Sequence, residues 1–150
     1  MRLIPAFAVL SLLAACTQDP PQGPDRPEPP APPPVLGGVD LGQPLRALGA
    51  EPFWGVDITP TAIKYAGVDR PEQTAPNPGP TITGTTAAYA TQTVQGDRLE
   101  ITLIATECSD GMSDRTYPLT ARVVIGAETL QGCAASTAAI MGGGESGPVQ

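Results

Sequence analysis

The side chains best suited to chemistry lie close together between residues 107 and 115. They are Glu107, Asp110, Ser113, Asp114 and Arg115. Their oxygens are ligand types that a hard cation takes, although the spacing departs from the calcium loop with its central glycine and terminal glutamate. The same residues suit an irregular loop, because aspartate and serine cap backbone amides and arginine pairs with a neighbouring carboxylate. We treat residues 107–115 as a candidate binding loop and favour the structural interpretation over a metal site.

Catalytic chemistry has little support elsewhere in the chain. The sequence has no histidine, which removes the commonest general base and a common metal ligand. It shows no nucleophile elbow or zinc-ligand spacing, and Gly142-Gly143-Gly144 lacks the lysine of a phosphate-binding loop. Nothing indicates a pocket that would shift the pKa values of Asp110 and Asp114 for acid-base work. We expect a protein that is not an enzyme and that uses no metal or cofactor.

The three cysteines divide into two kinds. Cys16 closes an apolar amino-terminal run and is expected to carry lipid. Cys108 and Cys133 are expected to form a disulfide, because thiols of an exported domain are oxidised. The alternation of the adjoining strands places both outside the core-facing positions, so we expect the bridge on a rim of the domain. Redox catalysis is the weaker alternative, because no C-x-x-C pairing is present.

The amino terminus indicates export and lipid attachment. Met1-Arg2 is a short basic start, residues 3–13 are apolar but short for a membrane span, and Ala14-Ala15 fit a peptidase pocket. With Cys16 they resemble the bacterial lipoprotein signal, which implies removal of residues 1–15 and acylation of Cys16. Thr17 stands where the inner-membrane retention signal has aspartate, so the resemblance implies the outer membrane, facing the periplasm. The alternative is an ordinary secretory signal that ends in a chance cysteine.

Proline dominates the segment that follows the lipid site. Residues 16–38 form the expected tether, with prolines at 20, 21, 24, 27, 29, 30, 32, 33 and 34. Such a segment cannot build a core and extends as polyproline II, which gives the stretch from Pro20 to Pro34 a reach of roughly 45 Å. The tether is therefore expected to be disordered and to lift a folded domain clear of the membrane.

The charge of the chain limits its partners. The precursor carries a formal net charge of −7, and loss of Arg2 with the signal peptide would bring it to −8. Nucleic acid and anionic lipid are poor partners for such a chain, whereas a basic envelope protein is a possible one. No second apolar stretch is long enough to cross a bilayer, so the lipid is the expected membrane contact.

Alternating apolar residues predict the folded part. Strands are expected over residues 53–58, 62–66, 98–106, 119–125 and 129–134, and the threonine-rich residues 81–94 favour strands as well. The prolines of residues 67–80 indicate an exposed loop between them. The pattern predicts an all-β fold, a small antiparallel barrel or sandwich of about six to eight short strands over residues 39–136. Residues 137–150 are expected to form a flexible tail.

Three short motifs carry a family resemblance. They are Ala50-Glu51-Pro52-Phe53-Trp54, the run from Cys108 to Pro118, and Leu130-Gln131-Gly132-Cys133-Ala134. Over about residues 45–134 the chain resembles a family of uncharacterised bacterial membrane-associated lipoproteins, and more distantly the small β domains of META-type envelope proteins. The resemblance implies a location and a fold and brings no activity with it.

The expected function is that of a lipid-anchored envelope protein, a non-catalytic binding or structural module. One alternative is an inhibitor or scavenger of a basic protein such as lysozyme, which the acidic balance favours. Another is a small-ligand carrier, which requires an open cavity inside the barrel rather than one filled by side chains. Trp54 could serve as a ligand platform, but a lone tryptophan in a small domain is more often a core anchor, which is the role we expect.

Overall fold

The computed structural model describes residues 31–149, which from Pro32 onward belong to one compact unit. The expected signal peptide, the lipid site at Cys16 and residues 17–30 of the expected tether lie outside the described residues. Between residues 31 and 149, no helix has the length and apolar character that a bilayer span requires.

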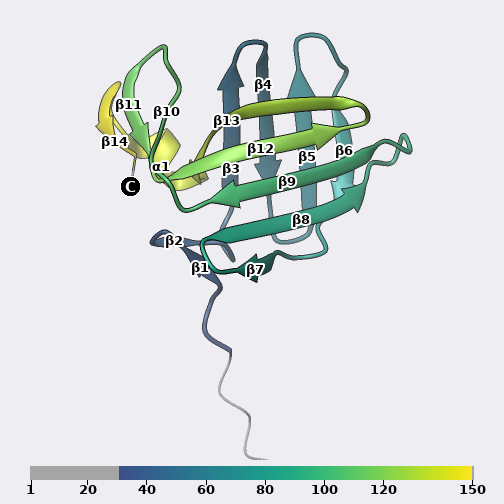
Figure 1. Cartoon of the computed structure of the whole chain (residues 1–150), viewed down its shortest axis with the longest axis horizontal. Coiled ribbons are helices and arrows are strands. Elements are labelled where there is room, and N and C mark those ends of the chain that lie inside the picture. Colours follow the sequence, from purple (N-terminus) through teal and green to yellow (C-terminus); the bar gives the residue numbers. More distant parts are fainter. Residues whose placement is uncertain (1–30, 150) are drawn as a thin grey trace, which may run out of the picture. The chain divides into compact units, whose positions relative to one another are not determined.

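The described residues form fourteen strands and one short helix (Figure 1). Nine strands make one antiparallel sheet, in the order β6-β5-β4-β3-β13-β12-β9-β8-β7, which curls into a half-barrel. The expected all-β fold is confirmed, with more strands than the six to eight predicted. The sheet strands are β3 (Leu45–Ala50), β4 (Phe53–Ile58), β5 (Ala62–Gly67), β6 (Gln73–Pro76), β7 (Thr81–Thr83), β8 (Thr86–Gln92), β9 (Arg98–Ile104), β12 (Leu119–Ile125) and β13 (Glu128–Ser136).

The remaining elements lie beside this sheet (Figure 1). A small hairpin joins β1 (Val35–Leu36) to β2 (Val39–Asp40), and a three-stranded sheet contains β10 (Cys108–Ser109), β11 (Asp114–Tyr117) and β14 (Ser146–Pro148). The helix α1 (Thr137–Gly142) follows β13 directly. The folded part begins earlier than the expected residue 39, because Leu36 in β1 is already buried in the core.

Alternation of apolar residues builds the core, as a half-buried strand requires. In β9 the inward residues Leu99, Ile101 and Leu103 are fully buried, and they face inward residues of the paired strand β12, such as Val123. With Tyr89 from β8, these side chains fill the interior of the half-barrel.

Two strands of the nine-stranded sheet were not expected from the sequence. In β3 the inward positions include Ala47 and Gly49, which carry too little apolar surface for the alternation to be conspicuous. The strand β6 lies within residues 67–80, where only a loop was expected. It is an edge strand, the position in a sheet where a proline such as Pro76 is tolerated.

The two ends of the curled sheet approach each other. The backbone N–H of Val94, just after β8, donates to the carbonyl oxygen of Thr74 in β6 at 2.9 Å. The hydroxyl of Thr91 donates to the carbonyl oxygen of Pro76 at 3.0 Å. These bonds cover part of the edge of β6, which an open sheet would leave unpaired.

The carboxyl-terminal segment is ordered, contrary to the flexible tail expected over residues 137–150. Ser136 caps α1 by accepting a hydrogen bond from the backbone N–H of Ala139, and β14 then pairs in parallel with β11. Val149 is buried, and its N–H donates to the carbonyl oxygen of Thr116 at 2.8 Å. The high glycine content suggested a tail, but backbone pairing and one buried valine hold this segment on the domain.

Candidate functional site

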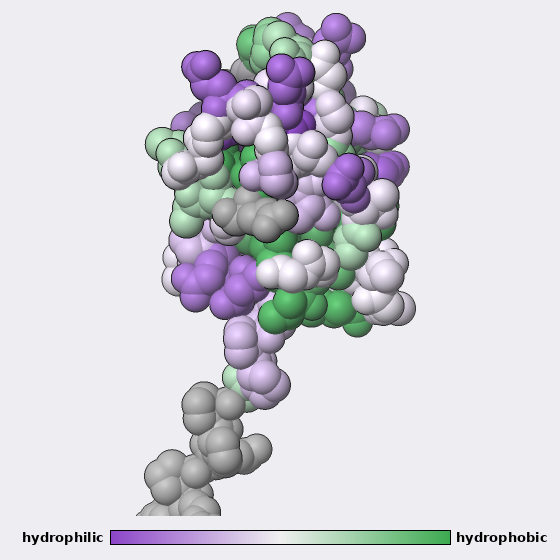
Figure 2. Space-filling view, turned by 90° about the vertical axis from the view of Figure 1, so that its left-hand side faces the viewer, coloured by the Kyte–Doolittle hydropathy of each residue, from purple (hydrophilic) through white to green (hydrophobic). Residues whose placement is uncertain are grey.

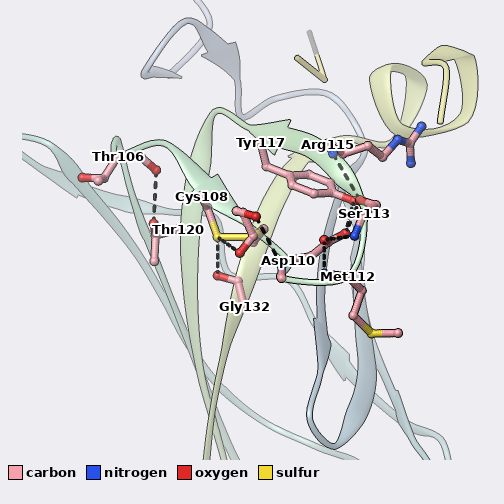
Figure 3. Close-up of a disulfide and its surroundings, with 12 residues drawn as sticks. Thr106, Cys108, Asp110, Met112, Ser113, Arg115, Tyr117, Thr120 and Gly132 are labelled. Carbon is pink, nitrogen blue, oxygen red and sulfur yellow. Dashed lines mark hydrogen bonds between the residues drawn. A yellow bond between two sulfur atoms is a disulfide. The ribbon is translucent and has the colours of Figure 1, made fainter. Parts of the chain in front are cut away.

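A disulfide joins Cys108 in β10 to Cys133 in β13 (Figure 3). The two Cα atoms lie 5.5 Å apart, a usual separation for a disulfide. Cys133 lies on the face of β13 opposite the main core, as its parity predicted, but it is not on a rim. It is completely buried in a second apolar cluster that includes Tyr117, Ala135 and Val149, because the carboxyl-terminal segment covers this face.

Asp110 organises the loop between β10 and β11. Its carboxylate accepts hydrogen bonds from the N–H groups of Met112 and Ser113, from the Ser113 hydroxyl at 2.8 Å and from the Tyr117 hydroxyl at 3.2 Å (Figure 3). Gly111 has a positive φ of 71°, which suits the turn. Each carboxylate oxygen therefore serves the loop itself, as in the structural interpretation of this segment.

The hydrogen bonds also set the ionisation of this pair. Burial would raise the pKa of Asp110, but the bonds from Ser113, Met112 and Tyr117 outweigh burial and hold the pKa below its ordinary value of 3.8. Burial and the nearby Asp110 charge raise the pKa of Tyr117. Asp110 is therefore ionised and Tyr117 protonated at neutral pH, which suits a structural bond rather than proton transfer.

The two remaining carboxylates of the candidate loop do not take part in these hydrogen bonds. Glu107 and Asp114 are exposed, and within residues 31–149 neither forms an ion pair. No group of three histidine, cysteine, aspartate or glutamate side chains gathers among the described residues, so the carboxylates of this loop are not brought together as metal ligands.

The sequence suggested that Arg115 pairs with a neighbouring carboxylate. In the structure it pairs with no carboxylate of the described residues. Its guanidinium instead donates to three carbonyl oxygens at the end of α1 and beyond it, those of Ile140 (3.0 Å), Gly143 (3.1 Å) and Gly144 (2.8 Å). Carbonyls at the end of a helix lack intrahelical partners, and a cation there is favourable. Arg115 thus fastens the carboxyl-terminal segment to β11.

Trp54 is buried at the β3–β4 end of the half-barrel, with 5% of its surface exposed. A Cβ atom added to Gly49 would overlap the indole Nε1, and one added to Gly132 would lie 2.9 Å from Cζ2. The two glycines on neighbouring strands therefore make room for the ring. In this position Trp54 is a core side chain rather than an open platform for a ligand.

A groove crosses the outer surface between this end of the sheet and the β10–β11 loop. We call it the loop groove; it comprises two adjoining hollows, of about 580 and 490 Å³, that share Leu48–Ala50, Asp110 and Met112. Phe53, Val68 and Met112 line it with exposed fractions of 56%, 68% and 66%, large values for apolar side chains. Glu51 and Asp110 add negative charge to the part of the groove beside β13.

The sequence did not single out these three apolar residues. They come from three separate segments, and only the fold brings them together. One signal was present: Phe53 breaks the alternation by adding an apolar residue at an outward position next to the inward Trp54.

A charged cluster, which was not predicted from the sequence, closes the half-barrel. Arg70 donates to Asp97 and to Glu128, both at 3.1 Å, and the side chain of Gln73 donates to Asp97 at 2.8 Å. These residues come from the region around β6, the β8–β9 turn and the β12–β13 turn, so the cluster joins loops that are distant in sequence.

A further cavity, of about 750 Å³, lies outside the barrel beside the β1–β2 hairpin. Val39, Pro44, Pro118 and Val149 contribute to its mainly apolar lining. Figure 2 shows hydrophobic residues on this side of the domain near the point where the chain enters it. The only carboxylate that lines the cavity within the described residues, that of Asp40, already accepts a hydrogen bond from Gly42.

The loop groove and this cavity differ in character. The groove combines exposed apolar side chains with carboxylates, whereas the cavity is mainly apolar. The groove is the stronger candidate for protein recognition, because apolar side chains exposed together mark interaction sites.

Comparison of the chain with protein-family models, with curated proteins and with solved structures gave no match.

Proposed function

We propose that this chain is a lipid-anchored protein of the bacterial cell envelope, and that its β domain is a non-catalytic module that binds another protein in the loop groove. One observation carries the binding role: Phe53, Val68 and Met112 are exposed and line one groove although they come from three segments. Complete burial of a fully exposed apolar side chain of this size contributes about 1.5 to 3 kcal/mol, and these three side chains retain somewhat more than half of that exposure. A partner that covered all three would therefore gain enough to offset part of the cost of association.

The anchor is proposed from the amino terminus. A lipidated Cys16 and a proline-rich tether over residues 16–38 would hold the domain near the outer membrane, on its periplasmic side. The resemblance to membrane-associated lipoproteins supports this location. Metabolic labelling with palmitate and membrane fractionation test the anchor: the wild-type chain should carry label and sediment with membranes, and Cys16→Ser should lose both. An unlabelled wild-type chain would contradict it.

The groove is tested by a matched pair of triple variants in cells. Phe53→Ser/Val68→Ser/Met112→Ser removes the apolar lining, and Val35→Ser/Val94→Ser/Met141→Ser removes three side chains that are similarly exposed but line neither hollow of the groove. After chemical crosslinking and affinity purification, the proteins bound to the wild type should be lost from the groove variant and retained by the control. Equal recovery from both variants would reject the groove as the binding site.

A second candidate function is the capture of basic proteins, of which lysozyme is an example. The supporting observation is that Glu51, Asp69, Glu107 and Asp114 are exposed and form no ion pair within the described residues. Purified domain at increasing concentration should slow lysozyme, and Glu51→Lys/Asp69→Lys should weaken the effect more than Glu145→Lys. Unchanged lysozyme activity would remove this form of the proposal.

A further inference from the structure

One edge of β13 is unpaired over the residues that directly follow the β12–β13 turn. The pairing of β13 with β12 covers Glu128 to Ala134, whereas its pairing with β3 covers only Cys133 to Ser136. The backbone of β3 still lies against Gln131 and Gly132, and Figure 1 shows the β12–β13 hairpin extending beyond β3. Over residues 128–130 the strand therefore has a paired neighbour on one side only within the part of the chain that the structure describes.

The turn determines which backbone groups face this open edge. Gly126-Ala127 is a two-residue turn closed by the pair Ile125 and Glu128. The closing pair of such a hairpin exchanges both hydrogen bonds, and the pattern then alternates along the strand. Glu128 and Leu130 thus bond to β12, whereas Thr129 directs its N–H and C=O away from β12, toward the open edge.

Gln131 agrees with this alternation. A Cβ atom placed on Gly49 would lie 2.8 Å from the carbonyl oxygen of Gln131, so this carbonyl is on the β3 side of the strand. Gln131 therefore faces β3, and the open edge presents the N–H and C=O of Thr129. A strand edge of this kind is a template for pairing with another chain.

A small hollow of about 210 Å³ lies against the open edge. Its lining includes Glu128, Thr129 and Leu130 of β13 together with Phe53 and Val68. The same two exposed side chains also line the loop groove, so the open edge and the groove share an apolar wall. An extended chain on β13 would place alternate side chains against Phe53 and Val68.

The charge around this edge indicates what kind of peptide segment would bind there. Asp69 and Glu128 line the hollow, and Glu51 and Asp110 line the part of the loop groove beside β13. The part of the groove that shares Phe53 and Val68 with the hollow contains one cation, Arg46, which is paired with Asp57. Glu128 is paired with Arg70, but Glu51 and Asp69 form no ion pair within residues 31–149. A strand that brings positive charge is therefore complementary to this edge.

We propose that an extended segment of the partner protein, with lysine or arginine alternating with aliphatic residues, adds to β13 at Glu128–Leu130 and extends the sheet. This inference rests on the proposed binding function and names the mode and the partner chemistry. Main-chain bonds to Thr129 hold the segment, aliphatic side chains contact Phe53 and Val68, and basic side chains meet Glu51 and Asp69.

The test uses an end-blocked peptide of five lysine-valine repeats. In an NMR titration it should shift the Thr129 amide signal and slow the exchange of this amide with solvent. The control peptide has the same sequence, but the backbone nitrogens of its central residues are methylated. Its side chains and charge are kept, whereas these backbone N–H donors are lost. It should bind at least about tenfold more weakly, the loss expected for one or more main-chain hydrogen bonds.

Variants of the protein add a second readout. Thr129→Pro removes the N–H that faces the open edge and should weaken binding of the unmethylated peptide about tenfold or more, whereas Thr129→Val keeps that N–H and should bind like the wild type. Thermal unfolding of both variants establishes that they are folded. Glu51→Lys/Asp69→Lys should also weaken binding, and Glu145→Lys, an exposed charge change outside the groove, should not.

The outcomes separate this inference from the proposed function. If the methylated and unmethylated peptides bind equally, or if the peptide does not bind while the groove variant still loses its cellular partners, strand addition is rejected and the groove remains a binding site. If the groove variant and its control retain the same partners, the binding function itself is rejected.

Discussion

The indole Nε1 of Trp54 occupies the space that a side chain on Gly49 would need. The two residues face each other as partners in the β3–β4 pairing, and a Cβ atom on Gly49 would overlap Nε1. Neither the indole ring nor the backbone at position 49 can shift easily, because both residues lie in buried strand positions. The residue type at position 49 therefore determines whether the tryptophan fits in the core.

Gly49→Ala should lower the free energy of unfolding by about 1 to 3 kcal/mol, because overpacking forces the ring or the strand to shift. The control is Gly142→Ala near the end of α1, where a Cβ atom would meet nothing within 4 Å. Urea denaturation followed by tryptophan fluorescence measures both variants. Equal stability of the two would show that the ring has more freedom than this packing allows.

Removal of the disulfide should cost about 3 kcal/mol in the chain-entropy model, since it closes a loop with a sequence separation of 25. Cys108→Ala/Cys133→Ala is the appropriate variant, because it leaves no free thiol at the buried position 133. Denaturation of the wild type with and without reductant provides the comparison. A double variant as stable as the oxidised wild type would show that the second apolar cluster holds without the bridge.

Asp110 should make the domain lose stability in acid. Its pKa is lowered in the folded state, so its contribution is fully present above about pH 4, the range of a free aspartate, and is lost as the pH falls through the folded-state value. Asp110→Asn should flatten this part of the stability profile, whereas Asp114→Asn should leave it unchanged. The effect is measured as the free energy of unfolding of the three proteins between about pH 2 and pH 6, the range in which carboxyl groups titrate. Identical acid profiles for the wild type and Asp110→Asn would contradict the assigned hydrogen bonds.

Tyr89 has a buried hydroxyl that lacks a hydrogen-bond partner within the described residues. Burial raises its pKa to about 12, so folding favours the protonated form and stability should fall as the pH rises from about 10 through that value. Tyr89→Phe should remove this decline and raise stability at neutral pH by about 1 kcal/mol, because an unpaired polar group leaves the core. Differential scanning calorimetry at pH 7 and 11 tests both effects, with Tyr117→Phe as the control that loses a hydrogen bond. A destabilised Tyr89→Phe would indicate that the hydroxyl has a partner.

The strands that could be predicted are those in which large apolar residues alternate. Leu99, Ile101 and Leu103 define β9, and Trp54, Val56 and Ile58 define β4, because inward positions alone carry bulky side chains. The strand β3 was missed because Ala47 and Gly49 are small, and Trp54 leaves no room for a side chain at Gly49. The physical reason for this glycine lies on another strand and is invisible in the local pattern.

The hydrogen bonds within residues 107–115 could be suggested from the sequence, but the long-range partners of this loop could not. Asp110 bonds within the loop, which local chemistry can suggest, whereas Arg115 binds carbonyls of a segment 25 to 29 residues away. That contact exists only because the carboxyl-terminal segment returns to β11. The convergence of Phe53, Val68 and Met112 is likewise a product of tertiary structure, so sequence periodicity could not reveal it.

The central claim is that one groove of this domain carries protein binding, and photocrosslinking in cells tests it most directly. A benzophenone amino acid is placed at Met112 in the loop groove or at Met141, which is equally exposed but lies at the end of α1. Irradiation of the anchored protein should give a discrete crosslinked product from position 112 that Phe53→Ser/Val68→Ser abolishes, and no such product from position 141. The same products from both positions, or none from position 112, would contradict the account.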